Sequence, residues 1–465
     1  MAQQRAKTAS AAQASALTRA AGEFVASIAF EDIPANAVAI ARTGFIDCIG
    51  TMIAGSVEPP PKLLSEVLGV SGSQGEASLY LGSTRGPAPD VAWINGTAGH
   101  ALDYDDVAQR GHPSTVLVPA LLAEGEALGA SGRELIAAYV AGYEVWAELV
   151  SREPDHHHEK GWHPTGIFGS IAAAAAVAAL KRLDATHATH AIALGASQAG
   201  GVMANFGTMT KPFHAGHAAH AGVIAARLAA AGFTASADAL EHPQGFLAAV
   251  SPKGRVDRTS PPRGLGAVWR IPEEGLSIKQ YPCCYCTHRA IDGMLGLVAT
   301  HGIKPESVKR INVSLSKTYA TILRNHRPDT GLAAKFSMEF AMAAAVIARS
   351  VGLAELTDSF VRRPDVQALM TRVVLDPNEN YGEGSLGGAV YDQVIVHLED
   401  GVVLQGEQVR HARGHAKRPL TRDELARKFK GCLAFARSKR DPDKLFARLE
   451  RLEELASVRE LVEGS

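Results

Sequence analysis

The stretch from Asn95 to Asp106 concentrates residue types that can move a proton. It reads Asn-Gly-Thr-Ala-Gly-His-Ala-Leu-Asp-Tyr-Asp-Asp, so one histidine and three carboxylates fall within twelve residues. Such a cluster is costly to bury unless its members pair with one another or take part in a reaction. We interpret it as a proton-transfer site in which His100 titrates, while Asp103 and Asp106 fix the loop and the imidazole tautomer. The structural alternative is that Asn95 caps a helix ahead of a solvated acidic turn.

Two further polar clusters precede segments with helical patterns. Residues 162–165, Trp-His-Pro-Thr, place His163 and Thr165 at a helix N-terminus, where backbone N–H groups favour an anion. The alternative is a loop histidine followed by a threonine cap. In residues 207–214, Lys211 stands among a glycine, hydroxyls and a proline ahead of a helix. A lysine held there would be a fixed positive charge for a substrate carboxylate.

Two other groups contain metal-ligand residue types without the spacing of a metal site. Histidines recur at every third position from 214 to 220, which rotates the last one away, and no carboxylate lies between them. The Cys-Cys-x-Cys run at 283–286 does not have the spacing of a zinc pair. We expect buried thiols there, and Lys279 is the residue of interest nearby. Because phosphate-loop, dinucleotide and nucleophile-elbow motifs do not appear either, the sequence predicts no metal and no cofactor.

Length and composition indicate a soluble, two-domain enzyme-sized protein. The chain has 465 residues and a formal net charge of -1, so no global field favours nucleic acid or an anionic membrane. The longest apolar run, residues 171–180, is shorter than the roughly 20 residues that a membrane span needs. The five cysteines suit a reducing cytoplasm. We interpret residues 1–18 as a frayed tail, although their composition could mimic a transit peptide.

Apolar periodicity predicts the elements that must position these residues. It is helical over most of residues 12–231, with a capping box at 131–134 and a cap at Asp184. Alternating patterns follow a Pro- and Gly-rich stretch at 256–266. The candidate strands are 308–317, 372–375, and a hairpin in which Asp400-Gly401 joins 394–399 to 402–409. The predicted fold is mainly α, with an all-α domain (1–268 and 412–465) and an inserted α+β domain (269–411).

Four motifs occur in order along nearly the whole chain, from about residue 20 to residue 456. They are Asn95-Gly-x-Ala-x-His-x-Leu-Asp-x-Asp-Asp106, Thr210-Lys-Pro-x-His214, Lys279-x-Tyr-Pro-Cys-Cys284 with Thr287-His288, and Ala334-Lys-Phe-Ser337. Together they resemble the MmgE/PrpD family, which includes 2-methylcitrate dehydratases, cis-aconitate decarboxylases and iminodisuccinate epimerases. The resemblance implies an all-α domain built from both chain ends and an inserted α+β lid domain. It also implies a homodimer that uses no metal or organic cofactor.

Matched position by position, the resemblance implies roles for individual residues. His100 corresponds to the acid/base histidine of the family and Asp90 to its upstream aspartate. His163, Lys211 and Lys279 correspond to pocket residues that hold carboxylates. The remaining substrate-binding candidates are Thr165, Thr210, Asp103, His288 and Arg324.

This chain departs from the family pattern at two places. The 2-methylcitrate dehydratases carry an arginine and an Asn-Asp pair where this chain has His100 and Asp105-Asp106, which favours the decarboxylase and epimerase branch. The decarboxylases carry a lid tyrosine shortly before an Arg-Pro pair. Aligned on Arg327-Pro328, this chain has Arg324 there, and an added cation would suit a different or more anionic substrate.

The leading hypothesis is a cofactor-independent lyase or isomerase that moves a proton beside a carboxylate of a small di- or tricarboxylate. Dehydration of a 2-methylcitrate-like substrate and decarboxylation of a cis-aconitate-like substrate are the first candidates, and epimerisation of an iminodisuccinate-type substrate is an alternative. A metal-dependent hydrolase with His100, Asp103 and Asp106 as ligands is another. The last alternative is a non-catalytic dimeric carboxylate-binding protein.

Overall fold

The computed structural model describes residues 17–381 and 388–462. The predicted frayed tail, residues 1–18, lies almost wholly outside the described residues. The described chain is mainly α-helical, as the sequence predicts, and divides into two compact units. Among the described residues, unit 1 comprises residues 17–101, 105–276 and 425–462, and unit 2 comprises residues 102–104, 277–381 and 388–424. The main changes of unit therefore fall at 276/277 and 424/425, where the sequence placed them at 268/269 and 411/412.

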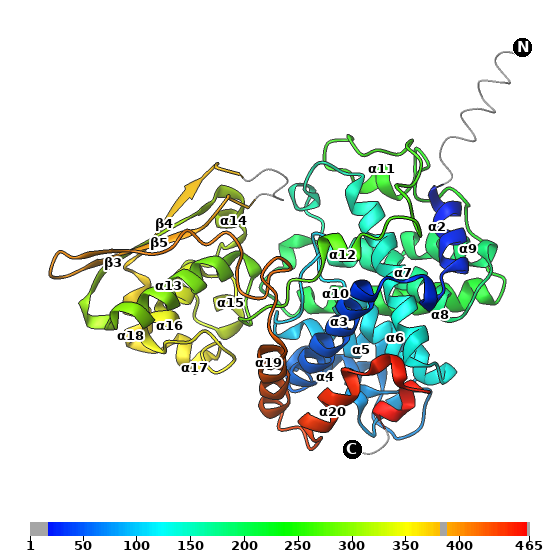
Figure 1. The fold of residues 1–465 in the computed structure, drawn as a ribbon, viewed down its shortest axis with the longest axis horizontal. Coiled ribbons are helices and arrows are strands. Elements are labelled where there is room, and N and C mark those ends of the chain that lie inside the picture. The colour runs from blue at the N-terminus through cyan, green and yellow to red at the C-terminus, as the bar shows by residue number, and fades with distance from the viewer. Residues whose placement is uncertain (1–16, 382–387, 463–465) are drawn as a thin grey trace, which may run out of the picture. The chain divides into compact units, whose positions relative to one another are not determined.

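Unit 1 consists of packed helices and one short antiparallel ladder (Figure 1). The ladder joins β1 (Ala77–Ser78) to β2 (Arg85–Gly86). The helices are α2 (Leu17–Ser27), α3 (Ala35–Gly55), α4 (Pro59–Leu68), α5 (Ala88–Ala101), α6 (Ser114–Leu128), α7 (Gly132–Ser151), α8 (Pro164–Leu180), α9 (Ala185–Ser197), α10 (Thr210–Ala230), α11 (Phe246–Val250), α12 (Ile271–Glu274), most of α19 (Arg422–Phe435), and α20 (Pro442–Leu449).

Local capping signals start several helices where the sequence predicts them. Ser131 and Glu134 form a complete capping box at the start of α7. Asp184 accepts the backbone N–H of His187 at 2.9 Å and begins α9. Each bond satisfies a first-turn N–H group that has no partner inside its own helix.

The alternative in which Asn95 caps a helix is wrong. Asn95 lies inside α5, one helical turn and more before its end, and is buried. Its side-chain amide donates to the carbonyl oxygen of Ser78 at 3.2 Å and accepts the N–H of Tyr80 at 3.1 Å. The side chain therefore ties the short ladder to α5, because a buried amide needs both kinds of partner.

Helices α5 and α10 approach closely because glycines face each other where they cross. A Cβ atom on Gly216 would lie 2.2 Å from the carbonyl oxygen of Trp93, and one on Gly96 would lie 2.8 Å from Gly216 Cα. His100 follows Gly96 by four residues, whereas Lys211 precedes Gly216 by five. Antiparallel packing at the glycines therefore brings His100 and Lys211 to the same level.

Helix α3 forms part of the core of unit 1. It is long and apolar enough to cross a membrane by composition alone, but 72% of its most apolar window is buried inside the protein. Part of that cover is α19, since Phe429 Cδ2 lies 3.0 Å from where a Cβ on Gly50 would stand. The chain that returns from unit 2 thus completes the packing around α3.

Unit 2 holds a four-stranded mixed sheet in the order β4-β3-β5-β6. Strand β3 runs parallel to β4 and antiparallel to β5, and β5 and β6 form the hairpin that the sequence predicts. Helices α13 and α16 lie along one face of this sheet (Figure 1). The elements are β3 (Val308–Ser316), β4 (Val373–Asn378), β5 (Gln393–Leu398), β6 (Val403–Gln405), α13 (His288–His301), α14 (Lys317–Ile322), α15 (Gly331–Ala334), α16 (Met338–Ile347), α17 (Asp358–Val361) and α18 (Pro364–Met370).

The close approach of α5 and α10 predicts that Gly216→Ala destabilises the protein by about 1–3 kcal/mol, because the new methyl group overlaps a backbone carbonyl. Gly431→Ala in α19 is the control, since a Cβ there meets nothing within 4 Å. That substitution should stabilise the helix by about 0.5–1 kcal/mol. Urea unfolding of both variants measures the difference. A Gly216→Ala protein as stable as the parent would contradict the packing described.

Candidate active site

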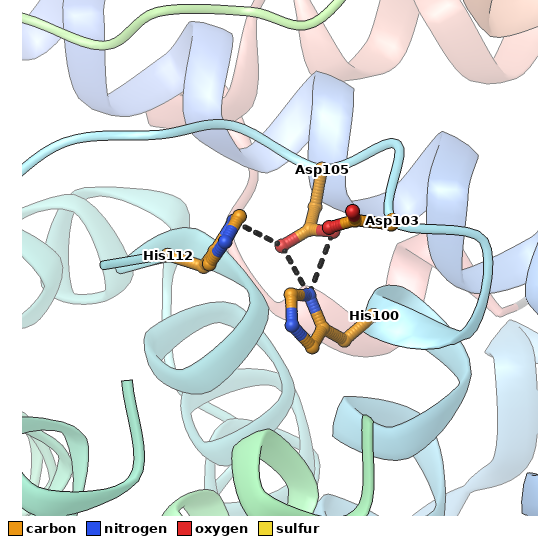
Figure 2. Close-up of side chains that lie close together, drawn as sticks. All are labelled: His100, Asp103, Asp105 and His112. Atoms are coloured by element: carbon orange, nitrogen blue, oxygen red, sulfur yellow. Dashed lines mark hydrogen bonds and ion pairs between the residues drawn. The ribbon is translucent and has the colours of Figure 1, made fainter. Parts of the chain in front are cut away.

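His100 lies in the last turn of α5 and is buried, with 1% of its surface exposed. Its Nδ1 atom lies 2.9 Å from each carboxylate oxygen of Asp105 (Figure 2). Its Nε2 atom lies 2.9 Å from the ammonium nitrogen of Lys211. A carboxylate only accepts hydrogen bonds and an ammonium only donates them. The contacts therefore fit a neutral His100 that donates through Nδ1–H and accepts at Nε2.

The electrostatics of the site agree with that protonation state. Burial lowers the pKa of His100 to about 3, Asp105 acts in the opposite direction, and the positive charge of Lys211 lowers the pKa further. Burial would raise the pKa of Asp105, but His100 and His112 outweigh it and hold this pKa well below the usual range. A neutral imidazole thus sits between an ionised carboxylate and an ammonium.

The chain turns sharply after α5 and brings Asp105 back to the ring of His100 (Figure 2). Asp103 has a φ of +52°, a left-handed conformation that aspartate tolerates better than most residues. The sequence analysis assigned the imidazole tautomer to Asp103 and Asp106. The structure corrects this, because Asp105 is the carboxylate that contacts Nδ1 of His100.

Asp105 is shared with a second histidine. His112 Nδ1 lies 3.2 Å from Asp105 Oδ2 and 2.8 Å from the backbone oxygen of Asp106. Because a carbonyl oxygen only accepts, His112 carries its proton on Nδ1. The rings of His100 and His112 have centroids 4.4 Å apart. Asp105 and the backbone oxygen of Asp106 therefore both favour the Nδ1–H tautomer of His112.

Two more histidines and a phenylalanine surround Lys211. The Nδ1 atoms of His163 and His214 lie 3.1 Å apart, so one ring donates and the other accepts. The ring of His163 is stacked on that of His100, with centroids 6.0 Å apart. It packs edge-to-face with the ring of Phe206, with centroids 4.8 Å apart. The ammonium of Lys211 lies 5.5 Å from the ring centre of Phe206. Burial, and then the charge of Lys211, hold the pKa of His163 well below its usual range.

The first turn of α8 adds polar groups beside this cluster. Thr165 is fully buried, and its Oγ1 has no hydrogen-bond partner among the residues that the structure describes. Its backbone nitrogen and its Oγ1 each lie 3.2 Å from where a Cβ on Gly111 would stand, next to His112. A helix N-terminus favours negative charge. This is the element that the sequence predicts to hold an anion.

Several predicted site residues belong to unit 2. Lys279 is buried, and its ammonium donates to Oδ1 of Asp103 at 2.7 Å and to the backbone oxygen of Asp103 at 2.9 Å. His288 is buried at the start of α13, with Nε2 3.3 Å from the carbonyl oxygen of Cys283. Arg324 is exposed in the loop after α14. In unit 2, the structure therefore brings Lys279 and Asp103 together as an ion pair.

Asp90 is the predicted catalytic residue that the structure does not bring to His100. It lies in the first turn of α5, ten residues before His100, which is roughly 15 Å along the helix. Its carboxylate lies 3.9 Å from Nε2 of His220 instead. Thr210, by contrast, is the first residue of α10 and directly precedes Lys211.

Comparison with known proteins agrees with the motifs. Residues 19–259 match the MmgE/PrpD N-terminal domain, and residues 281–451 match the MmgE/PrpD C-terminal domain. The chain belongs to the MmgE/PrpD family. Its similar proteins include the cis-aconitate decarboxylase of Homo sapiens, 28% identical over 74% of this chain and 72% of the relative. The Aspergillus terreus cis-aconitate decarboxylase is 23% identical over 94% of each chain, and the cis-aconitate decarboxylase-like protein oryM of Aspergillus oryzae is 26% identical over 88% of each. These relatives support a lyase-type enzyme.

Sequence reasoning missed three contributors to the site of this MmgE/PrpD protein. Asp105 and His112 lie beside the ring of His100 because the chain turns at Asp103, and no local sequence pattern predicts that turn. His214 was considered only as a metal ligand. A detectable signal existed for it, since residues three apart on a helix share a face and His214 follows Lys211 by three.

One group in the described part of unit 1 places potential metal ligands close together. Ligand atoms of His100, Asp105 and His112 lie within 4.8 Å of one another. Both Nδ1 atoms are, however, engaged with Asp105, and Nε2 of His100 faces the ammonium of Lys211, which would repel a cation. Asp106, a ligand in the metal hypothesis, does not belong to this group. The geometry therefore favours proton transfer.

The low pKa of His100 predicts acid sensitivity. A histidine in the unfolded chain titrates near 6.5, and His100 titrates at about 3 when folded. Between these values the unfolded chain binds more protons, so stability falls as the pH falls below about 6.5, by about 2 kcal/mol at pH 5. His100→Asn should lose that part of the acid sensitivity, because its amide still donates to Asp105 without titrating. Urea unfolding at pH 7.5 and pH 5.0 tests this. The same drop in both proteins would contradict it.

Proposed function

We propose that this protein is a cofactor-independent lyase that decarboxylates a small tricarboxylate of the cis-aconitate type. The observation that carries the proposal is the 2.9 Å contact between Lys211 Nζ and His100 Nε2, two buried side chains. It places a fixed positive charge and a transferable proton at one point. The similar proteins named as cis-aconitate decarboxylases support the choice of reaction.

A polycarboxylate suits the donors that gather in unit 1. Lys211, the first turn of α8 and the hydroxyl of Thr165 all favour a negatively charged oxygen. A carboxylate is a stronger acceptor for an ammonium than a neutral imidazole is. Substrate binding is therefore expected to draw Lys211 toward the substrate and to release Nε2 of His100. Lys211 is then a cation, and His100 a base, on the same side of the substrate.

The chemistry needs both groups. When the bond between the substrate carbon and a carboxylate breaks, carbon dioxide leaves and the electron pair stays on the substrate, spread over its double bond and a remaining carboxylate. Lys211 stabilises this charge, and one proton then adds to carbon for each carbon dioxide lost. Because the lowered pKa of His100 favours its neutral form, we assign the shared proton of the resting pair to Lys211. Lys211 is thus the acid of the resting pair, and His100 is the acceptor that can share its proton.

Turnover assays by NMR in deuterated water test the reaction class. The panel contains cis-aconitate, citrate, 2-methylcitrate and iminodisuccinate. The expected result is loss of carbon dioxide from cis-aconitate, with one solvent deuteron in the product per turnover. Water loss from 2-methylcitrate, or inversion of iminodisuccinate, would redirect the proposal to the dehydratase or epimerase reaction. Stabilisation by these acids without any product would favour the carboxylate-binding protein.

Substitutions test the residue roles. His100→Asn and Lys211→Met should each lower kcat by about 10²–10⁴-fold while the protein stays folded. Lys181→Met is the matched control, because Lys181 pairs with Glu124 at 2.9 Å and stands at the far end of α8, roughly 27 Å along the helix from His163. Its activity should match that of the parent. A folded, fully active His100→Asn enzyme would overturn the proposed role of His100.

Chelation tests the metal alternative. Activity should be unchanged after exhaustive treatment with EDTA, because the contacts of His100 with Asp105 and Lys211 require no ion. Loss of activity that a divalent metal restores would instead favour the hydrolase hypothesis.

A further inference from the structure

A buried ion pair lies behind the loop that carries Asp105. Lys428 on α19 donates to Oδ1 of Asp47 on α3 at 2.6 Å, and the two side chains are 2% and 0% exposed. Lysine and aspartate are rarely buried so completely. Taking both charges out of water is so costly that such a pair is weak evidence for stability by itself. We therefore look for a role of this pair in the site.

The residue after Asp47 connects this ion pair to the site, because Cys48 Sγ lies 3.7 Å from where a Cβ on Gly99, the residue before His100, would stand. The carboxyl of Asp106 is fully buried, and burial together with the charges of Asp47 and Asp105 raises its pKa well above the usual range. Cys48 and Tyr139 face the same carboxyl, and burial and then Asp106 raise the pKa of each. Three carboxyl groups thus share one dry region behind His100.

The negative charge of each carboxyl group in that region is compensated differently. Asp105 accepts from His100 and His112, Asp47 forms an ion pair with Lys428, and the surroundings of Asp106 raise its pKa and so favour its neutral form. On its other side, His100 faces Lys211 from α10 and His163 from the start of α8. If either Lys428 or Asp47 is removed alone, the remaining charge is unpaired and acts on the neighbouring carboxyl groups at low dielectric.

We propose that Lys428 and Asp47 are positioning residues for the reaction: their ion pair holds the Asp105–Asp106 loop where Asp105 fixes the Nδ1–H tautomer of His100. Neither residue contacts the reacting atoms, and both act through the loop. The inference rests on the proposed acid–base function of the His100 and Lys211 pair. It extends the site to a helix more than 300 residues farther along the chain.

Removing the charge of Lys428 or that of Asp47 should disturb the Asp105–Asp106 loop to a similar extent. Without Lys428, the carboxylate of Asp47 is unpaired, acts on the carboxyl of Asp106 at low dielectric and displaces the loop. Without Asp47, the ammonium of Lys428 competes with His100 for the nearest carboxylate. When both charges are removed together, the loop keeps neutral neighbours and its conformation returns.

The test compares Lys428→Met, Asp47→Asn and the double variant. Each single substitution should lower kcat at least tenfold and leave KM within about twofold, because the substrate-binding donors stay in place. The double variant should regain kcat to within about threefold of the parent. Proton NMR with ¹⁵N-labelled histidine supplies a readout that needs no substrate. The Nδ1–H signal of His100 bonded to Asp105 should shift or vanish in the single variants and return in the double variant.

A second buried pair gives the matched control. Arg152 and Glu148 on α7 lie 2.5 Å apart, with side chains 0% and 6% exposed. Arg152→Met should lower Tm by roughly 5–10 °C, as Lys428→Met should. It should nevertheless leave the His100 signal and kcat near parental values.

The outcomes separate the inference from the proposed function. A folded Lys428→Met protein with a parental His100 signal would overturn the positioning role, whatever the assay shows. If Lys428→Met does not fold, a folded Asp47→Asn protein with an unchanged signal would overturn it equally. A signal that changes as expected in a protein without turnover on any acid of the panel would support the positioning role and defeat the proposed reaction.

Discussion

The contact between the buried ammonium of Lys211 and the neutral imidazole of His100 is the one on which the arrangement of the site depends. It is favourable only if the imidazole presents a lone pair, and Asp105 ensures this by accepting a hydrogen bond from the proton on the opposite ring nitrogen. It also requires two helices to approach more closely than ordinary side chains permit, which the glycines of α5 and α10 allow. The sharp turn at Asp103 supplies the carboxylate. The turn at Asp103, the glycine packing and the charge of Asp105 are thus all needed for one contact between two nitrogen atoms.

The same contact concentrates the positive charge of the site. Most basic groups around Lys211 are histidines whose pKa burial lowers, so the positive charge is concentrated on Lys211 and reinforced by helix termini. Such an arrangement favours an anion without the mutual repulsion of several lysines. The chain as a whole has a net charge of -1, so this preference is local and not a property of the surface.

Much of this arrangement could be predicted from sequence, and the failures have physical reasons. Capping boxes, the Asp-Gly hairpin and the apolar periodicities are local signals, and they gave the correct elements and a mainly α fold. His100, His163 and Lys211 stand out by residue type and by motif. The partner of His100 did not, because a single left-handed residue decides which aspartate reaches the ring.

Lys428 was missed for a different reason. In an amphipathic helix rich in Lys, Arg and Glu, a lysine is expected to face water, and nothing in the local pattern distinguishes one that is buried. Only the tertiary contact with Asp47 reveals it. Long-range charge pairing of this kind leaves no trace in a single sequence.

The division of unit 1 between the two ends of the chain also has a consequence for synthesis. Asp47 leaves the ribosome 381 residues before Lys428, a delay of roughly 20–80 s at usual elongation rates. Unit 2 is nearly continuous and can be complete before α19 emerges. During that interval α3 must keep its aspartate hydrated or protonated, so the region behind His100 cannot close fully. The loop that carries Asp105 therefore reaches its final environment only after α19 has been synthesised.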